Sequence, residues 1–216
     1  MKRPRVVVFD LGGVLIRICR SWAEACAAAG LPLRVDVKEA DASGRRHELS
    51  ARHGVGAISS DEFFRAVSAA LGGAYSPAEV QRVHDAWLLG EYPGVHGLID
   101  DLRSAGVATG VLSNTNHAHW VRLTPRHMGG TDEFPACGRT DHPHASHVLG
   151  LLKPDEAIYR AFERLSGATP EEIVFFDDLA ENVAAARACG WGASQVDHTG
   201  DTTAQMRGHM RELGLL

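Results

Sequence analysis

Four places in this sequence put a side chain that could do chemistry directly after a run of apolar residues. Short runs rich in β-branched residues are typical of buried strands in a parallel sheet. The carboxyl ends of parallel strands lie along one edge of the sheet, where open α/β sheets bind ligands. Side chains far apart in the sequence are therefore expected to meet at that edge: Asp10, Ser113 with Asn114, Lys153, and Asp177 with Asp178.

These side chains are complementary in charge. Asp10 and Asp178 offer the hard oxygen ligands that Mg²⁺ prefers. Lys153, together with the N-terminus of a helix expected to begin at Pro154, would favour an anion. The Ser113 hydroxyl and the amides after it can hydrogen-bond phosphate oxygens. A carboxylate nucleophile, a metal, a lysine and a hydroxyl are the groups that phosphoryl transfer uses, so the pattern predicts a phosphoryl-transfer site.

The elements that would position these groups alternate between strand and helix. This alternation predicts an α/β fold with a doubly wound parallel sheet and right-handed crossovers. Residues 126–146 look rich in loops, and residues 148–152 form a short apolar run before Lys153. The expected strands are 6–9, 107–112, 173–176 and 192–196, and the expected helices are 94–104, 117–123, 155–165, 179–189 and 202–213.

A long helical stretch interrupts the alternation after the first strand. Ser59 with Glu62, and Ser76 with Glu79, have the spacing of capping boxes at helix starts. A helix is also expected over 21–29, and a weaker one over 37–53. We therefore expect a catalytic core made of residues 1–16 and 92–216, with a small helical domain over 17–91 inserted into it.

Composition and charge narrow the function class. The chain has 216 residues and a formal net charge of −5, which argues against a general nucleic-acid binder. No apolar run reaches transmembrane length, and Asp10 and the glycines break the N-terminal apolar stretch too early for a signal peptide. The four cysteines have no CxxC pair and are interpreted as reduced thiols of a cytoplasmic protein: Cys19, Cys26, Cys137 and Cys189.

Four motifs of the sequence, taken in order, resemble those of the haloacid dehalogenase (HAD) superfamily. They are FDLGGVL at 9–15, VLSNTN at 111–116, KP at 153–154 and FFDDLAENV at 175–183. The resemblance spans the whole chain, and the helical insertion resembles the small cap of the first HAD cap type. The LSNTN stretch with His119, and FFDD followed by Asn182, look most like the bacterial sugar-phosphate phosphatases, in particular the α-glucose-1-phosphate branch.

The resemblance implies a role for each site residue. Asp10 would be the nucleophile that forms an aspartyl-phosphate, and Asn182 would orient the acidic loop. The phosphoryl group would be bound by Ser113, Asn114 and Lys153, and Lys153 would also shield Asp10. Mg²⁺ would be held by Asp10, the Gly12 carbonyl and Asp178, with Asp177 ligating directly or through water.

One position departs from the family pattern. Most phosphatases of the superfamily carry a second Asp two residues after the nucleophile, as acid and base for the leaving oxygen, and Gly12 stands there in this chain. The sugar-phosphatase branch tolerates this glycine. His119 is a candidate acid, although a packing or loop role is favoured for it.

The expected function is that of a Mg²⁺-dependent phosphatase for a small phosphorylated metabolite, with a sugar phosphate favoured. Two alternatives stay open: a metal-independent 2-haloacid dehalogenase, and a phosphate-binding protein without activity. The expected partner is a small phosphorylated substrate, with no nucleic acid and no membrane; the sequence leaves the oligomeric state open. His142, His144 and His147 have possible metal spacing, but a solvated or substrate-entry loop is favoured over a zinc site.

Overall fold

The sheet of this protein is parallel throughout and confirms the predicted doubly wound α/β fold. A computed structural model describes residues 3–34, 44–126 and 129–216. The strand order is β5-β4-β1-β6-β7, so the first strand of the chain lies in the middle. The strands are β1 (Val6–Phe9), β4 (Ala108–Ser113), β5 (His142–Ala145), β6 (Ile173–Asp177) and β7 (Gly192–Gln195).

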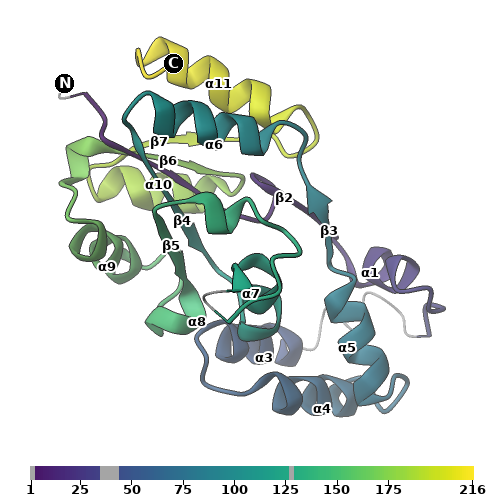
Figure 1. Ribbon diagram of the computed structural model, residues 1–216. Coiled ribbons are helices and arrows are strands. Elements are labelled where there is room, and N and C mark those ends of the chain that lie inside the picture. The colour runs from purple at the N-terminus through teal and green to yellow at the C-terminus, as the bar shows by residue number, and fades with distance from the viewer. Residues whose placement is uncertain (1–2, 35–43, 127–128) are drawn as a thin grey trace.

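Helices cover both faces of the sheet (Figure 1). On one face lie α6 (Val95–Ser104) and α11 (Thr202–Glu212), and on the other lie α9 (Glu156–Ser166) and α10 (Ala180–Ala188). Side chains of β1 alternate between the two cores, with Val7 and Phe9 in the first and Val6 and Val8 in the second. A strand buried on both faces needs an unbroken apolar run, which is why VVVF forms the centre.

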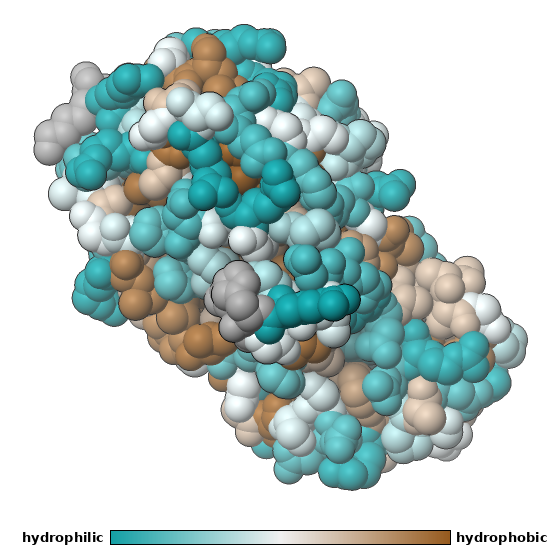
Figure 2. All heavy atoms as spheres, viewed as in Figure 1, coloured by the Kyte–Doolittle hydropathy of each residue, from teal (hydrophilic) through white to brown (hydrophobic). Residues whose placement is uncertain are grey.

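The described helices between residues 22 and 85 form a separate group with a hydrophobic core of its own. We call α1 (Trp22–Ala28), α3 (Arg45–Gly54), α4 (Ser60–Ala70) and α5 (Pro77–Asp85) the helical insert. Both expected capping boxes are present, at the starts of α4 and α5. Trp22, Phe64 and Tyr75 pack together inside the insert. Figures 1 and 2 show the insert as a smaller lobe at the lower end of the molecule.

The chain enters and leaves the insert through a two-stranded antiparallel ribbon that the sequence did not predict. It is formed by β2 (Ile16–Ile18) and β3 (Leu88–Glu91). The expected boundaries of the helical domain, residues 17 and 91, fall within β2 and at the end of β3. These domain boundaries stay a prediction. The expected helix over 37–53 lies partly outside the described residues, and its described part is α3.

Three other elements differ from expectation. The loop-rich stretch 126–146 contains β5, whose His-Pro-His-Ala sequence lacks the usual β-branched residues because it forms a short edge strand. The apolar run 148–152 before Lys153 overlaps the end of a short helix, α8 (Ser146–Leu149). Helix α9 begins at Glu156, so Pro154 precedes its first turn, contrary to the expectation that Pro154 begins the helix.

All four cysteines are buried and free, as expected for reduced thiols. Among the described residues, the helices are too short or too polar to cross a lipid bilayer.

Gly110 on β4 generates a stability prediction. A Cβ at this position would lie 2.8 Å from Phe162 Cζ of α9 and 3.2 Å from the carbonyl oxygen of His142 on β5. Gly110→Ala should therefore lower the free energy of unfolding by about 1–3 kcal/mol through overpacking.

The matched control is Gly208→Ala in α11, where a Cβ would meet no atom within 4 Å. It should raise the free energy by about 0.5–1 kcal/mol, since alanine favours helix. Denaturant unfolding measures both, and equal effects would refute the packing argument.

Candidate active site

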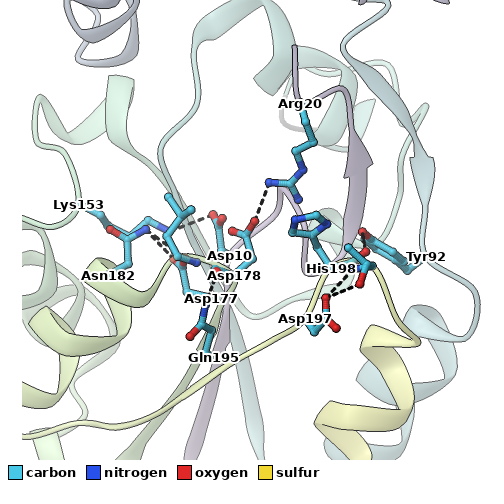
Figure 3. Close-up of polar contacts among 12 residues, drawn as sticks. Asp10, Arg20, Tyr92, Lys153, Asp177, Asp178, Asn182, Gln195, Asp197 and His198 are labelled. Carbon is cyan, nitrogen blue, oxygen red and sulfur yellow. Dashed lines mark hydrogen bonds and ion pairs between the residues drawn. The ribbon is translucent and has the colours of Figure 1, made fainter. Parts of the chain in front are cut away.

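The predicted site residues meet at the carboxyl edge of the sheet. Phe9 of β1 is in register with Phe176 of β6 and Val111 of β4. The residues that follow these positions, Asp10 and Asp177, therefore lie side by side (Figure 3).

A buried lysine joins two of the carboxylates. Lys153 Nζ lies 2.6 Å from Asp177 Oδ2 and 3.0 Å from Asp10 Oδ1. Burial disfavours the ammonium, but the two carboxylates outweigh it and hold the pKa of Lys153 above its usual value. Burial raises the pKa of Asp10 to about 6, against the lowering effect of Lys153. The site thus keeps its lysine charged.

Asp177 accepts hydrogen bonds on both oxygens and is fully buried. Asn182 Nδ2 of α10 donates to both oxygens at 3.0 Å, and the Leu179 amide donates to Oδ1 at 2.9 Å. These contacts agree with the predicted orienting role of Asn182. Asp177 also forms the ion pair with Lys153 and lies close to the carboxylates of Asp10 and Asp178.

Asp178 pairs with an arginine that the sequence reasoning missed. Arg20 NH1, from the segment after β2, donates to Asp178 Oδ2 at 2.7 Å (Figure 3). Gln195 Nε2 donates to the Asp178 carbonyl at 2.9 Å. No local sequence signal marks Arg20, because it follows no predicted strand of the sheet. Only the path of the β2–β3 ribbon brings it to the site.

Asn114 positions the lysine backbone. Its side-chain Nδ2 donates to the Lys153 carbonyl at 2.8 Å, and its Oδ1 accepts from the Lys153 amide at 2.9 Å. The side chain is therefore engaged, and a contact of Asn114 with phosphate would use its backbone amide. Ser113 is buried beside Asp10, and its hydrogen bond lowers the pKa of that carboxyl.

The two glycines after Asp10 play different roles. Gly13 has a φ of +79°, and a Cβ there would lie 2.5 Å from Asp178 Oδ2, so this position requires glycine. Gly12 is not among the residues with positive φ. A Cβ at Gly12 would lie 2.9 Å from Ile18 Cδ1, the end of a flexible side chain. Position 12 therefore has no backbone requirement for glycine.

The carboxylates of Asp10, Asp177 and Asp178 are spaced so that they could bind one divalent cation. Asp10, Asp177 and Asp178 each offer an oxygen, and these oxygens lie within 4.8 Å of one another. Three carboxylates face two cations, Lys153 and Arg20, so this group of five keeps an uncompensated negative charge. Hard oxygen donors with excess negative charge are what Mg²⁺ prefers. Among the described residues this is the one group found with metal-ligand spacing, and the histidines of the β5–α8 segment do not form another.

His119 joins the core to the insert. Its Nε2 donates to the His84 carbonyl at 2.8 Å, and its amide donates to Asn116 Oδ1 at 3.1 Å. Its ring stacks on that of His84, with 3.8 Å between centroids. Burial, then His84, holds the pKa of His119 well below its usual range. These contacts favour the predicted packing role of His119 over that of an acid.

A cavity of about 500 Å³ lies between the insert and the carboxyl edge of the sheet. Gly12, Ser113 and Asn114 line it on the side of the sheet, and α3, α4 and α5 contribute much of the remaining wall. Ser113 and Asn114, two of the residues expected to bind phosphate, therefore face a space large enough for a small organic group.

Comparison with known proteins identifies the family of this site. A family model for haloacid dehalogenase-like hydrolases matches residues 4–190. The chain belongs to this hydrolase family. A curated relative of this hydrolase is "Phosphatase MT3486" of Mycobacterium tuberculosis (strain CDC 1551 / Oshkosh), which is 28% identical over 125 residues. The match covers 58% of this chain and 55% of the relative, so it spans about half of that protein.

Solved structures share the fold of this hydrolase over nearly its whole length. The HAD family enzyme BT-2542 of Bacteroides thetaiotaomicron has a TM-score of 0.78 at 22% identity, covering 95% of this chain and 100% of that one. The same enzyme has been solved with magnesium and inorganic phosphate. A HAD-like hydrolase of Porphyromonas gingivalis has a TM-score of 0.75 at 28% identity, covering 97% and 98%.

The buried ion pair predicts a large stability effect for Asp177. Asp177→Ala should lower the free energy of unfolding by about 3 kcal/mol, because Lys153 would remain buried with only Asp10 beside it. Asp100→Ala is the control, since Asp100 pairs with Arg139 at the surface. It should lower the free energy by less than about 1 kcal/mol. Denaturant unfolding of both variants tests the difference, which equal losses would contradict.

The stacked histidines predict acid lability. Burial, with His53 and Arg122 nearby, lowers the pKa of His84 to about 3, while the unfolded chain keeps the ordinary histidine value. Stability is then complete above about pH 6.5 and falls as the pH drops towards 3, by up to about 1.4 kcal/mol per unit and per such group. His84→Phe keeps a ring for stacking. It should lower the slope of the free energy of unfolding against pH by up to about 1.4 kcal/mol per pH unit.

The measurement is the free energy of unfolding between about pH 6 and pH 4.5. His47→Phe, at an exposed position of α3, is the control and should leave the slope as in the wild type. A His84→Phe slope equal to that of the wild type would contradict the assignment.

Proposed function

We propose that this hydrolase is a Mg²⁺-dependent phosphatase that removes phosphate from a small metabolite through an aspartyl-phosphate on Asp10. The observation that carries the proposal is Lys153, which is buried between Asp10 and Asp177, while Ser113, hydrogen-bonded to Asp10, also lines the cavity. A fixed ammonium beside a carboxylate is suited to binding a phosphoryl group next to its nucleophile.

Each side chain then has a definite task. An Asp10 oxygen attacks phosphorus, and the bond from phosphorus to the leaving oxygen breaks. Lys153 and the Ser113 hydroxyl neutralise and hold the phosphoryl oxygens. Water then attacks the aspartyl-phosphate, which releases phosphate and regenerates Asp10. Asp177 and Asn182 keep Lys153 in place during both steps.

The acid cluster supports the metal requirement. Asp10, Asp178 and the Gly12 carbonyl would hold Mg²⁺, with Asp177 ligating directly or through water, and the ion would polarise a phosphoryl oxygen and offset the charge of the phosphate. The magnesium and phosphate complex of BT-2542 supports this proposal by analogy of fold.

The two alternative functions, a dehalogenase and a phosphate-binding protein, require different groups from those that a phosphatase requires. A dehalogenase would use Asp10 in the same way but needs no metal, and the clustered Asp177 and Asp178 argue against it. A phosphate-binding protein would need the charged groups but not a carboxylate that acts as nucleophile. The expected cytoplasmic location and the absence of nucleic-acid and membrane partners stay predictions, as does the sugar phosphate as substrate.

Asp10→Asn should keep the fold and lose turnover, because an amide is not a competent nucleophile. Phosphate release from p-nitrophenyl phosphate with Mg²⁺ is the measurement. Asp101→Asn, at an ion pair of α6 on the surface, is the control and should keep wild-type activity. Near-normal turnover by Asp10→Asn would refute the covalent mechanism.

Chelation tests the metal requirement separately. Excess chelator should abolish turnover, and added Mg²⁺ should restore it. Asp178→Ala should remove activity or raise the Mg²⁺ requirement, while circular dichroism shows the protein folded. Full activity in chelator would support the metal-free alternative.

A further inference from the structure

The cavity beside the phosphate-binding end has an apolar wall. Ile18, Trp22, Phe63, Trp87, Leu88 and Leu152 all line it. Polar residues of α3, namely Arg46, His47 and Ser50, line the cavity at the side of the insert, and His47 and Ser50 are exposed. The inner space is therefore apolar and partly aromatic, with polar groups towards solvent.

Two ring nitrogens farther inside are already engaged. His119 Nε2 donates to the His84 carbonyl, and His53 Nε2 lies 3.0 Å from Ser60 Oγ. Burial lowers the pKa of His53 to about 4 and that of His84 to about 3, so these rings are neutral at neutral pH. A sugar in this space would bury several hydroxyls, and each one left without a partner costs about 1–3 kcal/mol. The wall offers a polyhydroxy group few partners, since Trp22 Nε1 and His84 Nδ1 are the buried lining atoms found without a hydrogen bond among the described residues.

Apart from His47, which is exposed on the insert, the described lining of the cavity lacks a group that could protonate a leaving oxygen. Its lining, as described by the structure, contains no carboxyl, thiol, ammonium or phenol. Gly12 stands where most phosphatases of the superfamily carry that acid, and the buried histidines are neutral. A leaving group must then depart as an anion. A phenol, with a pKa of about 10, does this far more readily than an alkyl alcohol.

Two independent observations, the aromatic wall and the missing acid, agree on one substrate class. We propose that the enzyme acts on phosphate monoesters of phenols, with the aromatic ring in the cavity between the insert and the sheet. This inference rests on the proposed phosphatase function and deepens it. Asp10 forms a bond to phosphorus, and the phenoxide leaves with the electron pair of the broken P–O bond. It takes its proton from solvent, and water then releases phosphate.

A substrate series tests the proposal with the wild-type enzyme and Mg²⁺. The probes are phenyl phosphate and 2-naphthyl phosphate as aryl esters, hexyl phosphate as an apolar alkyl ester, and glucose 1-phosphate and glucose 6-phosphate. We expect the aryl esters to have the highest kcat/KM. Hexyl phosphate should have a similar KM but a kcat lower by about 10²–10⁴-fold, since it needs an acid to leave.

The outcomes separate the inference from the proposed function. Glucose 1-phosphate or glucose 6-phosphate turned over as well as phenyl phosphate would overturn the inference and leave the phosphatase standing. Equal kcat for hexyl and phenyl phosphate would also overturn it, and His47 would then be the first acid to mutate. Turnover of none of the esters would mean that the proposed function itself is wrong.

Position 12 offers a matched pair of variants. Gly12→Asp places the missing acid where φ allows a side chain and only Ile18 must shift. It should raise the ratio of hexyl to phenyl phosphate kcat by at least 10-fold, within the usual range for a general acid. Gly12→Asn has the same shape without the proton and should leave the ratio unchanged. A ratio unchanged in both variants would contradict the missing-acid argument.

The cavity wall can be tested by binding as well as by turnover. Phenylphosphonate, which the enzyme does not hydrolyse, should quench tryptophan fluorescence, because Trp22 and Trp87 line the space. Leu88→Asn should weaken its binding by about 10-fold, and the near-isosteric Leu88→Met should change it little. Inhibition by inorganic phosphate should stay the same in both. Weaker binding of inorganic phosphate by the same factor would place the ring outside the cavity.

Discussion

The site depends on one buried charge, the ammonium of Lys153. A lysine removed from water is stable as a cation only if carboxylates meet it at close range, and Asp10 and Asp177 do so from two adjacent strands. Asn182 and the Leu179 amide complete the shell of Asp177, while Asn114 fixes the lysine backbone. Asp10, the proposed nucleophile, Lys153 and the acidic loop are thus one hydrogen-bonded unit that is formed without a ligand.

Two hydrogen bonds join the insert and the segment leading into it to the catalytic core. Arg20 reaches Asp178 from the segment that leads into the insert, and His119 of α7 (His117–Leu123) donates to the carbonyl of His84 on α5. The core supplies the charged groups, and the insert supplies much of the wall of the cavity. In the proposed function, selectivity and reactivity would therefore be set by different parts of the chain.

Much of the fold followed from local sequence rules. The VVVF and IVFF runs predicted buried strands, the two capping boxes fixed the starts of α4 and α5, and the strand ends predicted which charged groups meet. The elements that were missed lack such signals: β5 contains proline and histidine, and β2 and β3 pair with each other across the whole insert. Arg20 was missed for the same reason, because its partner is 158 residues away. The assignment of the special backbone position to Gly13 rather than Gly12 needed the dihedral angles themselves.

The central place of β1 has a consequence for synthesis. β1 is made first, but its two neighbours are β4 and β6, which begin at Ala108 and Ile173. While the ribosome adds the intervening residues, both edges of an apolar strand stay unpaired, and unpaired strand edges are sites of aggregation. The insert has its own hydrophobic core and is complete before β4 emerges. The nascent chain therefore carries a small helical unit next to an unprotected strand, and the acids of the proposed site can meet only after β6 has been made.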